Sequence, residues 1–120
     1  MAESIERPSV TIVLTTVGSE EKAAEIAKLV VGRRLAACVN ILPAVRSIYR
    51  WKGVVEDDRE HLLLIKTTRT SFAALASAIR EVHPYELPEL VAIESAEVES
   101  RFAAWVVDST GAGGTGDTRR

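Results

Sequence analysis

Four short segments of this 120-residue chain place nearly uninterrupted apolar or threonine side chains next to one another. They are residues 10–17, 36–42, 62–65 and 90–93. Successive side chains of a β-strand point to opposite faces, and an antiparallel sheet wetted on one side alternates apolar and polar residues. Strands formed by these segments would instead be apolar on both faces. A sheet built from them needs cover on both sides, which limits the possible folds more than any other feature.

Helical periodicity between these segments gives the order of elements. Apolar residues recur at steps of three and four between Ala23 and Val31, and again between Phe72 and Val82. Turns are expected at Lys52-Gly53 and Asp57-Asp58. The predicted elements are a strand over 10–17, a helix over 19–32, a strand over 36–42 that Pro43 interrupts and that resumes over 45–51, a strand over 60–67, a helix over 72–82, a strand over 90–96 and a helix over 100–107.

This order predicts an α+β protein with a ferredoxin-like split βαβ sandwich, an extended hairpin and a short C-terminal helix. The length suits a single domain, which we place at residues 9–110. Residues 1–8 are expected to be a disordered N-terminal segment, and 111–120 a flexible Gly-rich tail. The tail contains a G-x-G-x-x-G string, but no strand is expected before it and no helix has room to follow.

Two helices on one face of the sheet leave the other apolar face open. At about 25 cal/mol per Å², exposing such a face forgoes many kcal/mol, and soluble monomers rarely expose so large a patch. Cover by a second copy of the chain is therefore the favoured solution. The alternative is a monomer whose terminal helix and tail fold over this face.

Composition excludes several classes of partner. The net charge of −2 offers no basic excess for nucleic acid or anionic membranes. No apolar run approaches the roughly 20 residues of a membrane helix, and we expect no secretory signal. Cys38 is the single cysteine, which excludes an internal disulfide. We therefore expect a cytoplasmic protein that binds neither nucleic acid nor membrane.

The residues most able to carry chemistry lie between two prolines near position 85. His83, Tyr85, Glu86 and Glu89 fall within seven residues, and Pro84 and Pro88 stiffen the chain between them. Imidazole and carboxylate groups bind Zn²⁺ or Cu²⁺ and also transfer protons. The simpler interpretation is a helix that ends at His-Pro, followed by solvated glutamates. The predicted metal ligands are His83 and Glu86.

Four further residues are candidates for a ligand cleft, each with a structural alternative. Cys38 is either a metal-binding thiolate or, as we favour, a small buried apolar residue. Tyr49 and Trp51 either stack on a ring or anchor an interface, which we favour. Lys66 either contacts an anion or solubilises the end of a strand. No Ser-His-Asp or Cys-His-Asn set can be assembled, so no catalytic residue is assigned.

Four motifs together resemble the CutA family of divalent-cation tolerance proteins. They are Ala36-Ala-Cys-Val-Asn-Ile41, Ser47-Ile-Tyr-Arg-Trp-Lys-Gly53, Leu62-Leu-Leu-Ile-Lys-Thr67 and His83-Pro-Tyr-Glu-Leu-Pro-Glu89. The resemblance covers about residues 10–109. It implies a ferredoxin-like homotrimer, similar to PII signalling proteins, with its sheets turned toward the centre. It also implies a cytoplasmic role in tolerance of copper or other divalent metals, without an established reaction.

The same resemblance implies clefts between subunits that gather residues matching Trp51, Lys66, His83, Tyr85 and Glu86. Some family members carry a cysteine near the end of the first strand and a second histidine before His-Pro. Thr15 and Val82 occupy those positions here, which leaves only His83 for ligation of that kind.

The favoured function is a trimeric binding protein with a signalling or scaffold role, taking copper, another divalent metal or a small anion at clefts between subunits. A second hypothesis is a small acid–base enzyme that uses His83 and Glu86. A third is a structural oligomer that binds nothing specific.

Overall fold

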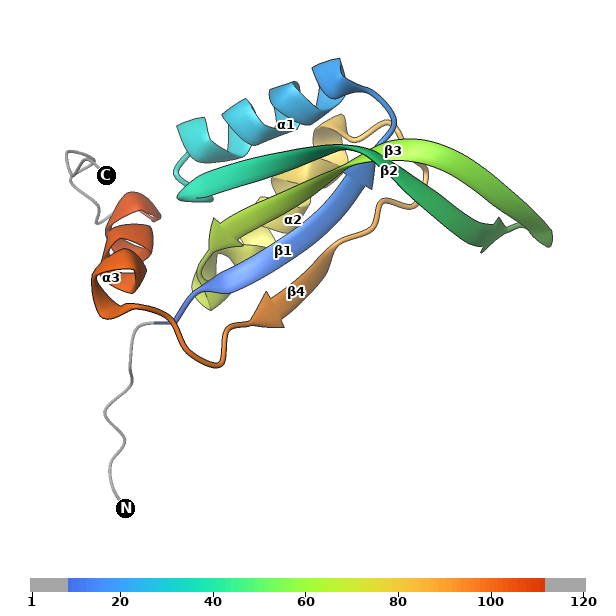
Figure 1. Ribbon diagram of the computed structural model, residues 1–120. Helices are drawn as coiled ribbons and strands as arrows, with labels where there is room; N and C mark the ends of the chain where they lie inside the picture. The colour runs from blue at the N-terminus through green and yellow to red at the C-terminus, as the bar shows by residue number, and fades with distance from the viewer. Residues whose placement is uncertain (1–8, 112–120) are drawn as a thin grey trace.

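The computed structural model describes residues 9–111, which form a four-stranded antiparallel sheet and three α-helices (Figure 1). The predicted segment 1–8, and residues 112–120 of the tail predicted over 111–120, lie outside the described residues. The elements are β1 (Thr11–Val17), α1 (Glu20–Gly32), β2 (Cys38–Trp51), β3 (Val54–Thr67), a 3-10 turn η1 (Arg69–Ser71), α2 (Phe72–Val82), β4 (Val91–Glu94) and α3 (Ser100–Ser109). No helix in the described part is long and apolar enough to cross a membrane.

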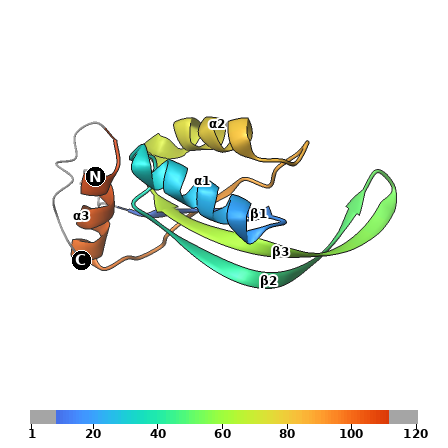
Figure 2. The same cartoon turned by 90° about the horizontal axis from the view of Figure 1, so that it is seen from above.

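The strand order β2-β3-β1-β4 is that of a split βαβ sandwich, which confirms the predicted fold class. Helix α1 connects β1 to β2, α2 connects β3 to β4, and both lie on the same face of the sheet (Figure 2). The hydroxyl of Ser19 accepts a hydrogen bond from the amide of Lys22 at 3.1 Å and so caps α1, as expected. Helix α2 ends at Val82 because His83, which precedes Pro84, is extended.

The main core lies between the sheet and helices α1 and α2. On β1 it is formed by alternate residues, of which Val13 and Val17 are fully buried. Ile26 of α1 and Leu75 and Ile79 of α2 pack against them. This face of the sheet is closed by the chain itself.

The opposite face of the sheet is apolar and largely open. The register sets its side chains in three rows across the strands, and the middle row places Leu14 beside Leu64 and Val91. The flanking rows add Ile12 beside Ile93, and Leu42 beside Leu62. Val91 and Ile93 are 47% and 49% exposed. The register also places Asn40 and Lys66 on these rows, so the face predicted to be apolar is largely but not wholly so. We call this surface the open face.

Helix α3 covers one end of the open face. Ala103 and Val106 are fully buried, and Phe102 and Trp105 join the cluster that contains Ile12. The helix lies at the end of the sheet remote from the β2–β3 hairpin, so the middle row stays outside this cluster (Figure 1). A short terminal helix is thus too small to cover the sheet, as the sequence predicted.

Two strand predictions are wrong and one holds in part. The interruption predicted at Pro43 is a break in pairing within one strand, because β2 runs from Cys38 to Trp51 with a register shift between Leu42 and Val45. An edge strand tolerates a residue without an amide hydrogen at such a bulge, and β2 is an edge. Asp57-Asp58 is not a turn, since β3 begins at Val54. The last strand is shorter than expected, at Val91–Glu94.

The long strands extend beyond the sheet as a two-stranded arm. Residues 45–60 of β2 and β3 pair with each other up to the turn at Lys52 and Gly53, and in Figure 1 they project past both helices. Charged residues such as Asp57 suit this arm because water reaches both of its faces. Ile48 and Val55 nevertheless remain 63% and 59% exposed, so the arm also carries apolar side chains that nothing in the described chain covers.

The bulge yields a prediction about stability. Ala44 has φ +61°, a left-handed conformation that costs a residue with a Cβ about 1–2 kcal/mol. Replacing Ala44 by Gly removes that cost but adds roughly 0.4–1 kcal/mol of unfolded-state entropy. We therefore expect Ala44→Gly to raise the free energy of unfolding by up to about 1 kcal/mol in urea titrations. Ala74→Gly, at an exposed site of α2, should lower it by about 1 kcal/mol. Equal losses of unfolding free energy in the two variants would show that Ala44 is not strained.

Candidate functional site

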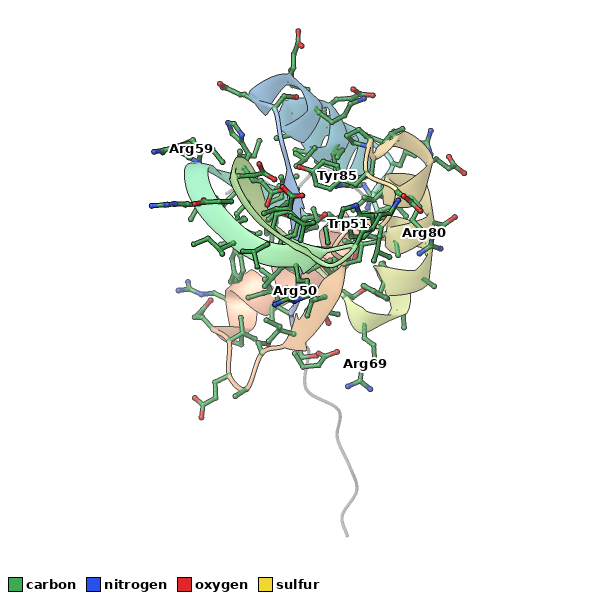
Figure 3. All side chains as sticks on the ribbon, turned by 90° about the vertical axis from the view of Figure 1, so that its right-hand side faces the viewer. Arg50, Trp51, Arg59, Arg69, Arg80 and Tyr85 are labelled. Atoms are coloured by element: carbon green, nitrogen blue, oxygen red, sulfur yellow. The ribbon has the colours of Figure 1, made fainter. Side chains whose placement is uncertain are left out.

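A groove of about 830 Å³ lies between the arm and the connector that follows α2. Five of the predicted site residues line it: Tyr49, Trp51, Tyr85, Glu86 and Glu89. The connector was expected to be extended between the two prolines, but it bends at Tyr85, Glu86 and Leu87. Three of its side chains, those of Tyr85, Glu86 and Glu89, line the groove. Trp51 and Tyr85 are seen along the arm in Figure 3.

His83 lies next to the groove without lining it. It is 8% exposed, and its Nε2 lies 2.8 Å from the carbonyl oxygen of Thr16. Because a carbonyl oxygen only accepts, Nε2 carries the hydrogen and donates it. Nδ1 is then free to accept the amide of Tyr85, which lies 3.2 Å away. Both ring nitrogens are thus engaged within the chain, and the imidazole fixes the start of the connector against β1.

Burial lowers the pKa of His83, because the ring is largely removed from water and a positive charge on it would lack hydration. The hydrogen bond to Thr16 and the charge of Glu60 act in the opposite direction, while Lys22 acts with burial. The bond from the Tyr85 amide requires the neutral ring, because a protonated Nδ1 has no lone pair to accept it. The imidazole therefore serves as a neutral bracket between β1 and the connector.

Two tyrosine–carboxylate pairs shape the floor of the groove. The Tyr85 hydroxyl donates to Glu60 Oε2 at 2.6 Å, and the Tyr49 hydroxyl donates to Asp58 Oδ2 at 2.5 Å. Burial and the bond to Glu60 raise the pKa of Tyr85. The bond to Asp58 raises the pKa of Tyr49 to about 12. Both hydroxyls thus stay protonated and act as donors to carboxylates.

Gly18 makes the approach of Tyr85 possible. A Cβ at position 18 would lie 3.3 Å from the Tyr85 hydroxyl oxygen, which is tighter than ordinary van der Waals contact. The ring of Tyr85 also meets that of His83 edge-on, with centroids 4.8 Å apart. The turn after β1, the histidine and the tyrosine therefore fit together as one unit.

Sequence reasoning missed two acidic residues of the site, Asp58 and Glu60. Both line the groove, and Glu60 is only 5% exposed. The signal was present in the alternation of acids at Glu56, Asp58 and Glu60, which places all three on one face of a strand. Treating Asp57-Asp58 as a turn concealed it.

Two predicted cleft residues lie elsewhere. Cys38 and Lys66 face each other across β2 and β3 on the open face, and neither lines the groove. Lys66 donates to Asn40 Oδ1 on the same surface. It is six residues from Glu60 along β3, or about 20 Å at the usual strand rise. Within one chain these residues and the groove are separate sites.

The predicted metal ligands, His83 and Glu86, share no contact within the described residues. Glu86 Oε1 instead lies 3.7 Å from Lys52 Nζ, at the mouth of the groove. Among residues 9–111, no three His, Cys, Asp or Glu side chains are gathered as a metal site. The donors that the groove offers are carboxylate oxygens, with both nitrogens of the histidine already hydrogen-bonded.

The histidine bracket predicts a dependence of stability on pH. Because the pKa of His83 is lower in the folded chain, its contribution is full above the unfolded value near 6.5 and is lost as pH falls below it. The midpoint of thermal unfolding should therefore fall between pH 8 and pH 5, and His83→Gln should make this midpoint depend less on pH. His61→Gln is the control and should keep the wild-type dependence on pH. An unchanged dependence of the midpoint on pH in His83→Gln would contradict this role of His83.

Comparison with known proteins assigns the family. The CutA1 divalent ion tolerance protein family matches residues 11–109. The divalent-cation tolerance protein CutA of Thermus thermophilus is 50% identical over 100 residues, 83% of this chain and 97% of its own length. Protein CutA of Homo sapiens is 44% identical over 98 residues, 82% of this chain, and the chain spans 55% of that longer relative.

Solved structures agree with this assignment. The divalent cation tolerance protein of Thermus thermophilus superposes with a TM-score of 0.83 at 49% identity, covering 85% of this chain and 99% of its own. CutA1 of Oryza sativa gives 0.84 at 33% identity, covering 88% and 96%. The likeness thus extends over most of the chain, 85% and 88% in these two comparisons, and over nearly the whole of each relative. The chain belongs to the CutA1 divalent ion tolerance protein family.

Proposed function

We propose that this chain acts as a homotrimeric, non-enzymatic binding protein in divalent-cation tolerance. The observation that carries the proposal is the open face, whose middle row of Leu14, Leu64 and Val91 remains partly exposed in one copy. Cover by identical copies removes this apolar surface from water without a second kind of protein. Three copies are the number that the family resemblance implies.

Assembly also explains the arm. Ile48, Val54 and Val55 project from it at 57–63% exposure, beyond the helices of their own chain. A neighbouring copy whose open face meets the first would bring protein close to this arm. The groove at its base, and the Cys38–Lys66 end of the sheet, would then border contacts between copies.

We assign the groove as the ligand site, with a cation rather than a small anion as its ligand. Four carboxylates line it, those of Asp58, Glu60, Glu86 and Glu89, whereas Arg50 is the guanidinium among its lining residues. Divalent metals such as copper or zinc fit the family's role. Since one chain gathers no three-ligand set among its described residues, such a metal would take donors from two copies.

His83 supports this site indirectly, by holding the connector that presents Glu86 and Glu89. We further assign the protein to the cytoplasm, with a signalling or scaffold role. Among the relatives, the Arabidopsis thaliana protein is named chloroplastic and a structure from Archaeoglobus fulgidus is titled periplasmic.

A charge placed in the middle row tests this proposal. Leu64→Arg should lower the thermal midpoint by more than about 10 °C, because a covered arginine without a partner costs several kcal/mol and each kcal/mol is worth roughly 4–8 °C. The zinc affinity measured by calorimetry should fall at least tenfold in the same variant. Val31→Arg on α1, where the valine is 40% exposed, should change the midpoint by less than about 4 °C.

The opposite pattern would contradict the proposal. If the open face is wet in solution, Leu64→Arg behaves like Val31→Arg, with a similar midpoint and an unchanged zinc affinity. If zinc binds neither the wild type nor the Val31→Arg control, the assignment of a divalent cation to the groove is wrong.

A further inference from the structure

The carboxylate of Glu60 is buried without a cation. Its side chain belongs to a residue that is 5% exposed, and it lines the groove. Oε2 accepts from Tyr85, and the structure records no ion pair for Glu60 with any described residue. Buried charges in proteins are normally paired, because an isolated one loses its hydration without compensation. The bottom of the groove is therefore built for a positive group that the described chain does not supply.

The walls of the groove are aromatic as well as acidic. Tyr49, Trp51 and Tyr85 line it together with the carboxylates. Aromatic faces attract ammonium and guanidinium groups through the negative charge above the ring. A metal ion instead needs several oxygen or nitrogen donors at fixed positions, and no such set is gathered in the described chain. An organic cation can contact the aromatic rings and the carboxylates at the same time.

The mouth of the groove already holds one such cation. The ammonium nitrogen of Lys52 lies 5.5 Å from the centre of the Trp51 ring and 3.7 Å from Glu86 Oε1. One aromatic face and one carboxylate thus bind an alkylammonium group that belongs to the chain itself. Deeper in the groove, the carboxylate of Glu60 meets Tyr85 through the phenol hydroxyl, and no ion pair to an ammonium of the described residues accompanies it.

We propose that the groove is a binding site for an organic ammonium or guanidinium group, with Glu60 as its anchor and Trp51 and Tyr85 as its walls. Lys52 competes for the outer part of this site. The inference rests on the groove being the ligand site of the proposed function, and it names a ligand class beyond divalent metals. The cation comes either from a free small molecule or from a side chain of a second copy.

The experiment titrates n-butylammonium chloride into the assembled wild-type protein at pH 7.5, followed by calorimetry and by tryptophan fluorescence, to which Trp51 and Trp105 both contribute. We expect saturable binding, and 1-pentanol, similar in shape but uncharged, should bind at least tenfold more weakly. Glu60→Gln should weaken butylammonium binding at least tenfold. Glu56→Gln is the matched control, because Glu56 lies on the same strand outside the groove lining, and it should stay within twofold.

A second variant guards against loss of folding in Glu60→Gln. Lys52 lies at the turn with a side chain 69% exposed, so Lys52→Met should keep the fold. It removes the competing ammonium, and we expect butylammonium to bind at least threefold more tightly. Unchanged affinity in both Lys52→Met and Glu60→Gln would overturn the proposal, as would equal binding of 1-pentanol.

The Leu64→Arg variant distinguishes the two sources of the cation. Binding to the wild type indicates a site open to free amines. Binding that appears only in Leu64→Arg indicates that a second copy fills the groove with its own cationic side chain. If butylammonium binds neither the wild type nor Leu64→Arg, the inference is wrong. If zinc still binds the wild type in that case, the proposed function stands.

Discussion

The structure depends on one constraint: its sheet has two largely apolar faces, and the helices within residues 9–111 close only one of them completely. Helices α1 and α2 close the first face around Val13, Ile26 and Leu75. Helix α3 reaches the Ile12 end of the second face and leaves the middle row open. The hydrophobic effect acts on both faces alike, so the free energy still available in one copy favours contact with another. The proposed assembly would draw on the same burial of apolar surface that folds the chain.

The same strands create the groove. The bulge at Pro43 and Ala44 lets β2 and β3 continue into an arm, and the arm places Asp58 and Glu60 opposite the connector that follows α2. His83 closes this arrangement by donating to Thr16 and accepting from Tyr85. A neutral histidine used as a bracket is a positioning group, which accounts for its burial without requiring ligation. The groove then presents carboxylates and aromatic rings to whatever it binds.

The sequence predicted the fold well because its signals are local. Helical periodicity in α1 and α2 and the two-sided apolar strands need only neighbouring residues to be recognised. The arm was harder to predict, because Pro43 and Asp57-Asp58 break a strand in a central position but not at an edge or in an exposed ribbon. Of the site, the residues of one connector were predicted together, whereas Glu60 depends on a contact across 25 positions of sequence. Such pairings are set by register, which the sequence alone does not specify.

The central claim, that identical copies cover the open face, is tested most directly by the mass of the wild-type particle on dilution. A chain of 13.0 kDa that trimerises through this face should sediment near 39 kDa, and should keep that mass at low micromolar concentration. A well-folded particle of 13.0 kDa at the same concentration, with its sheet in contact with water, would contradict the account.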